Sequence, residues 1–183
     1  MAFPLKISLV TALLLLTACR SDPIQFHTLT PAQLSGASSS AEIQIESITV
    51  PPQVDRPQIV IRQGNSGVAI LETEWWAATL VDELRSALVD QLVNNNPQRR
   101  VSLRLDVQRF DSIPGQYALI DVKWRLRSLG AGDTALITCR STLQTPSGPG
   151  IDDLVVAHQN NVKRLAAAVS QAIGSQKGCP SVS

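Results

Sequence analysis

The sequence contains few of the residues that commonly carry catalysis or bind metals. Its two histidines, His27 and His158, are far apart, and neither has a cysteine or acidic residue at metal-ligand spacing. The chain also lacks the Gly-x-Ser-x-Gly motif of acyl hydrolases and the Gly-Lys-Ser/Thr loop that binds nucleotide phosphates. Asp152 and Asp153 could act as paired catalytic carboxylates, but acidic residues are favourable at any helix start. The sequence therefore predicts a non-enzyme without a metal or dissociable cofactor.

The chain also lacks an excess of charge of one sign. It has 16 basic and 15 acidic residues. Lys6 is the only charged residue in residues 1–18, so removal of this segment would leave 15 of each. A neutral chain gives no electrostatic reason to expect nucleic acid or anionic lipid as a partner.

No apolar run approaches the roughly 20 residues that span a bilayer. A shorter run from Ile7 to Leu16 follows Lys6 and ends in Leu16-Thr17-Ala18-Cys19, which resembles the lipobox of bacterial lipoproteins. We expect residues 1–18 to be a signal peptide and Cys19 to carry a covalent lipid with several acyl chains, enough for stable anchoring. Arg20 stands where an aspartate would favour inner-membrane retention, so we expect the outer membrane, on its periplasmic face. The alternative is an ordinary signal peptide with a chance cysteine.

Two further cysteines, Cys139 and Cys179, form an even pair in a compartment that permits disulfides. We expect them to be bonded to each other, with two reduced thiols as the alternative.

Hydrophobic periodicity predicts strands in the first third of the chain. A brief strand is expected within 23–29, a flexible linker over 31–40 and a half-buried strand over 42–50, in which Ile48 breaks the alternation. Residues 58–62 and 68–71 flank the turn signal Gly64-Asn65-Ser66-Gly67 and predict a hairpin.

A helix is expected from Thr73, its N-cap, to the Asn94–Pro97 stop signal, because apolar residues recur every four positions. Trp75 and Trp76 would open this helix. Adjacent helical positions lie about 100° apart, so one indole should be exposed or at an interface; the alternative buries both at the helix–sheet junction. The apolar stripe comprises Trp76, Leu80, Leu84, Leu88 and Leu92.

The remaining chain predicts an antiparallel meander followed by a second helix. Alternating strands are expected over 101–108, 120–127 and 135–143, and the helix should be capped by Asp152. The predicted fold class is an α+β two-layer sandwich, an antiparallel sheet with two amphipathic helices packed on it. The expected organisation is a signal peptide (1–18), an anchored tether with a short strand and linker (19–41), and one α+β domain (42–183). The second helix has its apolar stripe at Val155, Val162, Leu165, Val169 and Ile173.

Several segments together resemble the ABC-type transport auxiliary lipoproteins of the PqiC/YmbA type. The most specific is Asp55-Arg56-Pro57-Gln58-Ile59-Val60. The others are Phe26-His27-Thr28-Leu29, Trp76-Ala77-Ala78-Thr79-Leu80, Val107-Gln108-Arg109-Phe110-Asp111 and Val122-Lys123-Trp124-Arg125-Leu126. The chain departs from the family pattern at Ala78 and Thr79, where the family has acidic and proline residues.

This resemblance implies an outer-membrane lipoprotein that works with a periplasmic MCE-domain protein and its ABC permease and ATPase in lipid transport between membranes. The implied role is to dock the far end of the MCE conduit. Candidate contact residues are Asp55, Arg56, Pro57, Trp75 and Trp76, although Asp55 and Arg56 could instead hydrogen-bond to each other. The alternative is a lipid-binding carrier or envelope-integrity lipoprotein without a transporter partner. An exposed indole and a neutral surface also permit a homo-oligomer.

Overall fold

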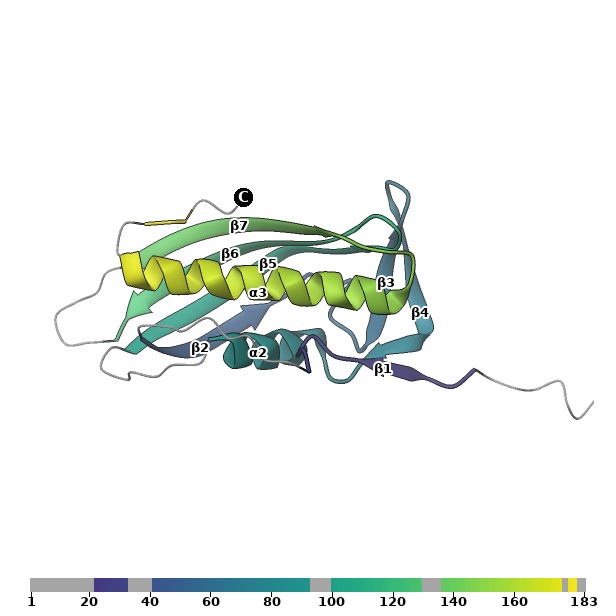
Figure 1. Cartoon of the computed structure of the whole chain (residues 1–183), viewed down its shortest axis with the longest axis horizontal. Helices are drawn as coiled ribbons and strands as arrows, with labels where there is room; N and C mark the ends of the chain where they lie inside the picture. Colours follow the sequence, from purple (N-terminus) through teal and green to yellow (C-terminus); the bar gives the residue numbers. More distant parts are fainter. Residues whose placement is uncertain (1–21, 33–40, 93–99, 130–135, 176–177, 181–183) are drawn as a thin grey trace, which may run out of the picture.

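The computed structural model describes residues 22–32, 41–92, 100–129, 136–175 and 178–180. The predicted signal peptide, Cys19 and most of the predicted linker lie outside these residues. Within them the α+β fold class is confirmed, with strands in two sheets and two helices (Figure 1). The elements are β1 (Gln25–His27), β2 (Glu42–Thr49), β3 (Gln58–Gln63), β4 (Gly67–Trp76), α2 (Leu80–Gln91), β5 (Arg100–Ile113), β6 (Tyr117–Ser128), β7 (Leu136–Pro146) and α3 (Ile151–Ser175).

The larger sheet has the strand order β2-β5-β6-β7. The predicted antiparallel meander of β5, β6 and β7 is confirmed, while β2 pairs with β5 in parallel. Irregularities at Glu46 in β2 and Gln108 in β5 shift the register. Each extra residue returns the following apolar side chains to the inner face, which is why Ile48 and Phe110 are buried although simple alternation would turn them outward.

The smaller sheet has the order β1-β4-β3. The predicted hairpin is β3 and β4, and Gly64 adopts a φ of 61° in its turn, a conformation that glycine accepts without strain. β1 pairs with β4 in parallel, with Phe26 opposite Trp75. β1 is therefore an edge strand held by the last residues of β4.

The first helix starts later than predicted, since Thr73–Trp76 belong to β4 and α2 begins at Leu80. The N-cap is Thr79, whose Oγ1 accepts the Asp82 N–H at 3.2 Å and donates to Asp82 Oδ2 at 2.8 Å. Trp76 lies four positions before Leu80 and is buried like the helix stripe, but it is buried as the last residue of β4 and not as part of the helix. From Leu80 onward the predicted stripe is correct, with Leu80, Leu84, Leu88 and Leu92 buried.

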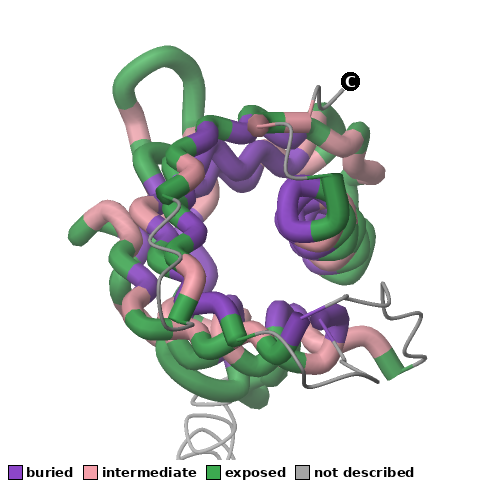
Figure 2. The backbone as a smooth tube through the Cα atoms, turned by 90° about the vertical axis from the view of Figure 1, so that its left-hand side faces the viewer, coloured by how far each residue is buried: buried purple, intermediate pink, exposed green. Residues whose placement is uncertain are grey.

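Both helices cover the same face of the larger sheet, and buried residues line the space between them (Figure 2). α3 packs on β6 and β7, while α2 contacts β2 and α3. All five residues of the predicted α3 stripe are buried. Asp152 is not the N-cap, as it lies inside the first turn; Asp153 Oδ2 instead accepts the N–H of Gly150 at 3.2 Å. No helix in the described ranges is both long and apolar enough to cross a membrane.

A disulfide between Cys139 on β7 and Cys179 joins the sheet to the segment after α3, with 5.5 Å between the two Cα atoms. Cys139 is buried on the inner face of the sheet. The covalent link thus lies at the end of α3 that is remote from β1.

Candidate functional site

An exposed aromatic pair marks the end of the domain from which the chain leads back to Cys19. The Phe26 side chain is 65% exposed, and its ring meets the Trp75 ring edge-on at a centroid distance of 6.3 Å. Trp75 is half-buried and donates its indole N–H to the Glu72 carbonyl at 3.0 Å, which fixes the ring. Together with exposed Ile24, these side chains form what we call the aromatic surface: Ile24, Phe26 and Trp75.

The Asp55–Pro57 loop lies against the strand that carries the aromatic surface. The Pro57 carbonyl accepts the Trp76 N–H at 2.6 Å, and the following residue, Gln58, is paired with Trp75. The fold thus brings together two of the segments predicted as contact sites, which are 18 positions apart when counted from Pro57 to Trp75.

Within the Asp55–Pro57 loop, Asp55 is exposed and Arg56 is half-buried. Among the residues that the structure describes, no hydrogen bond joins Asp55 to Arg56, and the buried Arg56 Nε has no hydrogen-bond partner. The interpretation of this pair as an internal hydrogen bond is therefore wrong.

Trp76 does not belong to the surface. Its side chain is only 3% exposed and packs edge-on against Phe110 and His158 in the core. Successive strand residues face opposite sides, so burial of Trp76 is what turns Trp75 outward. The expectation that one indole reaches the surface is met by Trp75, although on a strand rather than on a helix.

Polar contacts fasten the last residue of β1 and the residues after it to both helices. The buried carboxylate of Glu83 on α2 accepts the Thr28 hydroxyl at 2.8 Å and the Leu29 N–H at 2.7 Å. His27 Nε2 lies 2.6 Å from Glu74 Oε2, and its Nδ1 lies 3.4 Å from Asp152 Oδ1 at the start of α3. These contacts tie β1, which carries Phe26, to the rest of the domain. The role of Glu83 was not predicted from the sequence. The available signal was an acidic residue next to the apolar stripe of a predicted helix, where a carboxylate would be buried and would need hydrogen-bond donors.

The remaining titratable candidates have structural roles. His158 is fully buried, stacks on Phe110 at 4.0 Å and pairs with the Ser112 hydroxyl at 2.9 Å; burial lowers its pKa to about 3, so it is neutral at physiological pH. Asp152 and Asp153 turn to different partners, His27 and Gly150. No group of three or more metal-ligating side chains occurs among the described residues.

A model of the family described as the ABC-type transport auxiliary lipoprotein component matches residues 25–170, so the chain belongs to this family. The match includes β1, the Asp55–Pro57 loop and Trp75. The family's role in ABC-type transport is an auxiliary one, in association with a transporter, and as a lipoprotein family it indicates anchoring at a membrane. This role agrees with the prediction of a non-enzyme.

Two solved structures share the fold. The crystal structure of an uncharacterized protein superposes with a TM-score of 0.64 at 17% identity, and the match covers 83% of this chain and 99% of that one. The crystal structure of a protein from Xanthomonas campestris gives a TM-score of 0.54 at 17% identity, covering 85% of this chain and 96% of that one. A search of curated proteins gave no significant match.

Proposed function

We propose that this protein is anchored by a lipid on Cys19 to the periplasmic face of the outer membrane, where it docks the far end of an MCE-type conduit for lipid transport. The conduit would be the periplasmic MCE-domain protein, coupled at its other end to an ABC permease and ATPase. The observation that carries the proposal is the position of the aromatic surface. It lies beside the Asp55–Pro57 loop and includes β1, the described strand nearest to Cys19 in the sequence.

The length of the tether supports a contact close to the membrane. Gln25 lies six positions after Cys19, and even a fully extended chain of this length reaches only roughly 20 Å. A lipid on Cys19 would therefore keep β1 within about that distance of the bilayer. Contacts between Glu83 and residues 28–29 would transmit this restraint to the whole domain.

The chemistry of the surface supports a protein partner. Exposed aromatic residues and arginine are enriched at the centre of protein interfaces, where they supply much of the binding energy. Phe26 and Trp75 offer two such rings held in a fixed edge-on arrangement, with Arg56 on the adjoining loop. A preformed contact of this kind loses little side-chain entropy on binding.

The test is co-purification of the MCE-domain protein with the full-length lipoprotein from detergent extracts. The wild-type protein should retain the partner, and the Phe26→Ser/Trp75→Ser variant should lose most of it. The matched control is Val156→Ser, which removes an exposed apolar side chain from α3. The proposal is wrong if no MCE-domain protein is retained by the wild type, or if the control loses as much as the double variant.

A further inference from the structure

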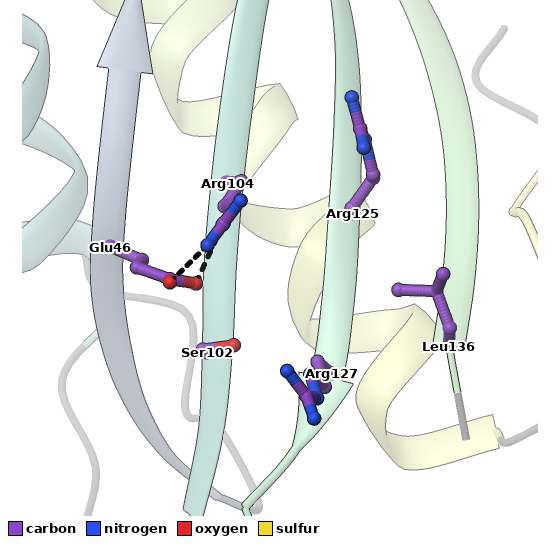
Figure 3. A pocket seen from close by; sticks show the side chains of 6 residues that line it. All are labelled: Glu46, Ser102, Arg104, Arg125, Arg127 and Leu136. Carbon is purple, nitrogen blue, oxygen red and sulfur yellow. Dashed lines mark hydrogen bonds and ion pairs between the residues drawn. The ribbon is translucent and has the colours of Figure 1, made fainter. Parts of the chain in front are cut away.

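The outer face of the larger sheet, opposite the helices, carries a group of arginines, which we call the basic cluster: Arg104 on β5 and Arg125 and Arg127 on β6. With Glu46, Ser102 and Leu136 they line an open cavity of about 330 Å³ (Figure 3). The side chains come from four neighbouring strands and surround one hollow in the sheet surface.

The register brings like charges together at this cavity. Arg104 lies directly opposite Arg125, and Arg127 lies opposite Ser102 on one side and Leu136 on the other. Like charges at directly opposite positions of two strands destabilise a sheet. The pairing of Arg125 with Arg104 therefore does not stabilise the fold.

Farther along the same face, carboxylates lie beside the basic residues. The next outward-facing pair along β5 and β6 is Asp106 opposite Lys123. Arg140 donates to both oxygens of Asp121, at 2.8 and 2.5 Å, and this interaction holds the pKa of the Asp121 carboxyl below its usual range. Lys123 also lies directly opposite Arg140 on β7, but at this position Asp106 stands opposite Lys123 and Asp121 is bonded to Arg140, so each basic residue has a carboxylate beside it.

The cavity has a surplus of positive charge. Glu46 is the single carboxylate among its lining residues, and both oxygens accept hydrogen bonds from Arg104, with Arg104 Nε at 2.7 Å. The pKa of Glu46 is lowered, chiefly by the hydrogen bond from Arg104, so Glu46 is ionised at neutral pH. Arg125 forms no hydrogen bond or ion pair with any residue in the described ranges. Three guanidinium groups therefore face one carboxylate, and an anion could neutralise the remainder.

The dimensions suit one phosphate group. Neighbouring strands lie about 4.8 Å apart, and residues two positions apart on a strand are separated by about 6.8 Å. The three arginine Cβ atoms are therefore close enough for long guanidinium side chains to meet on a single anion, and guanidinium forks match phosphate oxygens. Leu136, 61% exposed beside Arg127, adds an apolar contact at the rim.

The cluster lies at the opposite end of the domain from the aromatic surface. α3 starts beside His27 and, with 25 residues, extends about 37 Å to the end where the disulfide lies. Arg125 is opposite Thr138, the residue before Cys139, so the cluster lies at this far end. A ligand here would be bound away from the surface that we assign to the docked partner.

We infer that the basic cluster is a binding site for the phosphate group of a single lipid molecule, with Arg125 and Arg127 as the principal ligands and Leu136 in contact with the adjoining apolar part. The arginines alone support binding of a phosphate group, whereas the statement that this phosphate belongs to a lipid rests on the proposed function. A phosphate ester without acyl chains can therefore test the first statement independently of the second.

The test is isothermal titration calorimetry on the full-length protein in a neutral detergent. The probes are dihexanoyl phosphatidic acid, dihexanoylglycerol, which has the same acyl chains without phosphate, and glycerol phosphate, which has no chains. We expect phosphatidic acid to bind, glycerol phosphate to bind more weakly and dihexanoylglycerol not to bind.

Arg125→Gln and Arg127→Gln should each weaken phosphatidic acid binding about tenfold or more, because each removes charged hydrogen bonds. Lys163→Gln removes one exposed charge from α3 and should leave binding unchanged.

Each contrary result has a distinct meaning. Failure of both phosphate-bearing probes to bind, or equal binding by wild type and the arginine variants, overturns the site. Equal affinity for glycerol phosphate and phosphatidic acid overturns the lipid as its source. The arginine variants should still co-purify with the MCE-domain protein; loss of the partner without any phosphate binding would make the cluster a protein-docking surface and overturn the inference. Failure of the docking proposal would appear in the co-purification experiment alone.

Discussion

At the residue scale, one buried carboxylate links the chain after β1 to the rest of the domain. Glu83 accepts both the Thr28 hydroxyl and the Leu29 N–H. We expect Glu83→Ala to lower the free energy of unfolding by about 2 kcal/mol, because the buried Leu29 N–H loses its partner. Glu83→Gln retains one acceptor oxygen and should lose less. Urea unfolding of the two variants measures the difference, and equal losses would show that the hydrogen bonds are not responsible.

His158 makes the stability of the protein dependent on pH. Burial lowers its pKa from 6.5 to about 3, so between these values the unfolded chain binds a proton that the folded chain does not. This contribution to the free energy of unfolding is complete above pH 6.5 and is lost as the pH falls toward 3, by up to about 1.4 kcal/mol per pH unit.

We expect His158→Gln to show a smaller loss of stability between pH 7 and pH 5 than the wild type in urea unfolding. His27→Gln is the control, since it leaves His158 in place. NMR titration of the wild-type imidazole gives a second readout that does not depend on a variant. A His158 resonance that titrates near pH 6.5 in the folded protein would contradict the account.

At the scale of elements, local sequence signals predicted the strands better than the first helix. Period-two alternation identified β5 and β6 because one face of each strand is buried and the other is solvated. The start of the first helix was predicted too early because β4 enters the core and places the apolar Trp76 four positions before the helix stripe. The capping pattern of Thr79 and Asp82 was present in the sequence and marks the true start of α2.

The cap can be tested directly. We expect Thr79→Ala to destabilise the protein by about 1 kcal/mol, because the Asp82 N–H loses its acceptor at the start of α2. Thr79→Ser should retain most of the stability. Ser86→Ala, at an exposed position of the same helix, serves as the control and should cost nothing. Thermal unfolding distinguishes these outcomes, and equal melting temperatures for Thr79→Ala and wild type would exclude the cap.

The disulfide contributes at the same scale. Its cysteines are separated by 40 positions, and a crosslink of this length should stabilise the fold by up to about 4 kcal/mol on the chain-entropy model. We therefore expect Cys139→Ala/Cys179→Ala to unfold at a lower temperature than the wild type produced in the periplasm. Non-reducing mass spectrometry provides the control, because two free thiols in the wild type would show that the bond does not form.

At the scale of the whole molecule, pairings between distant segments place the features that sequence analysis could identify only separately. The parallel pairing of β1 with β4 brings Phe26 to Trp75, and no local pattern in either segment indicates that contact. The net charge of the chain likewise does not indicate how charges are distributed on the surface. Equal numbers of acidic and basic residues suggested no anionic ligand, but the register of β5 and β6 gathers three arginines on one side of the sheet.

The central claim is that the aromatic surface contacts an MCE-domain protein next to the membrane. Photo-crosslinking in living cells tests it most directly, with a photoreactive amino acid placed at Trp75 or, as the matched control, at exposed Val156 on α3. Mass spectrometry of the adducts should identify the MCE-domain protein from position 75 and not from position 156. Adducts with the MCE-domain protein from neither position, or equally from both, would contradict the account.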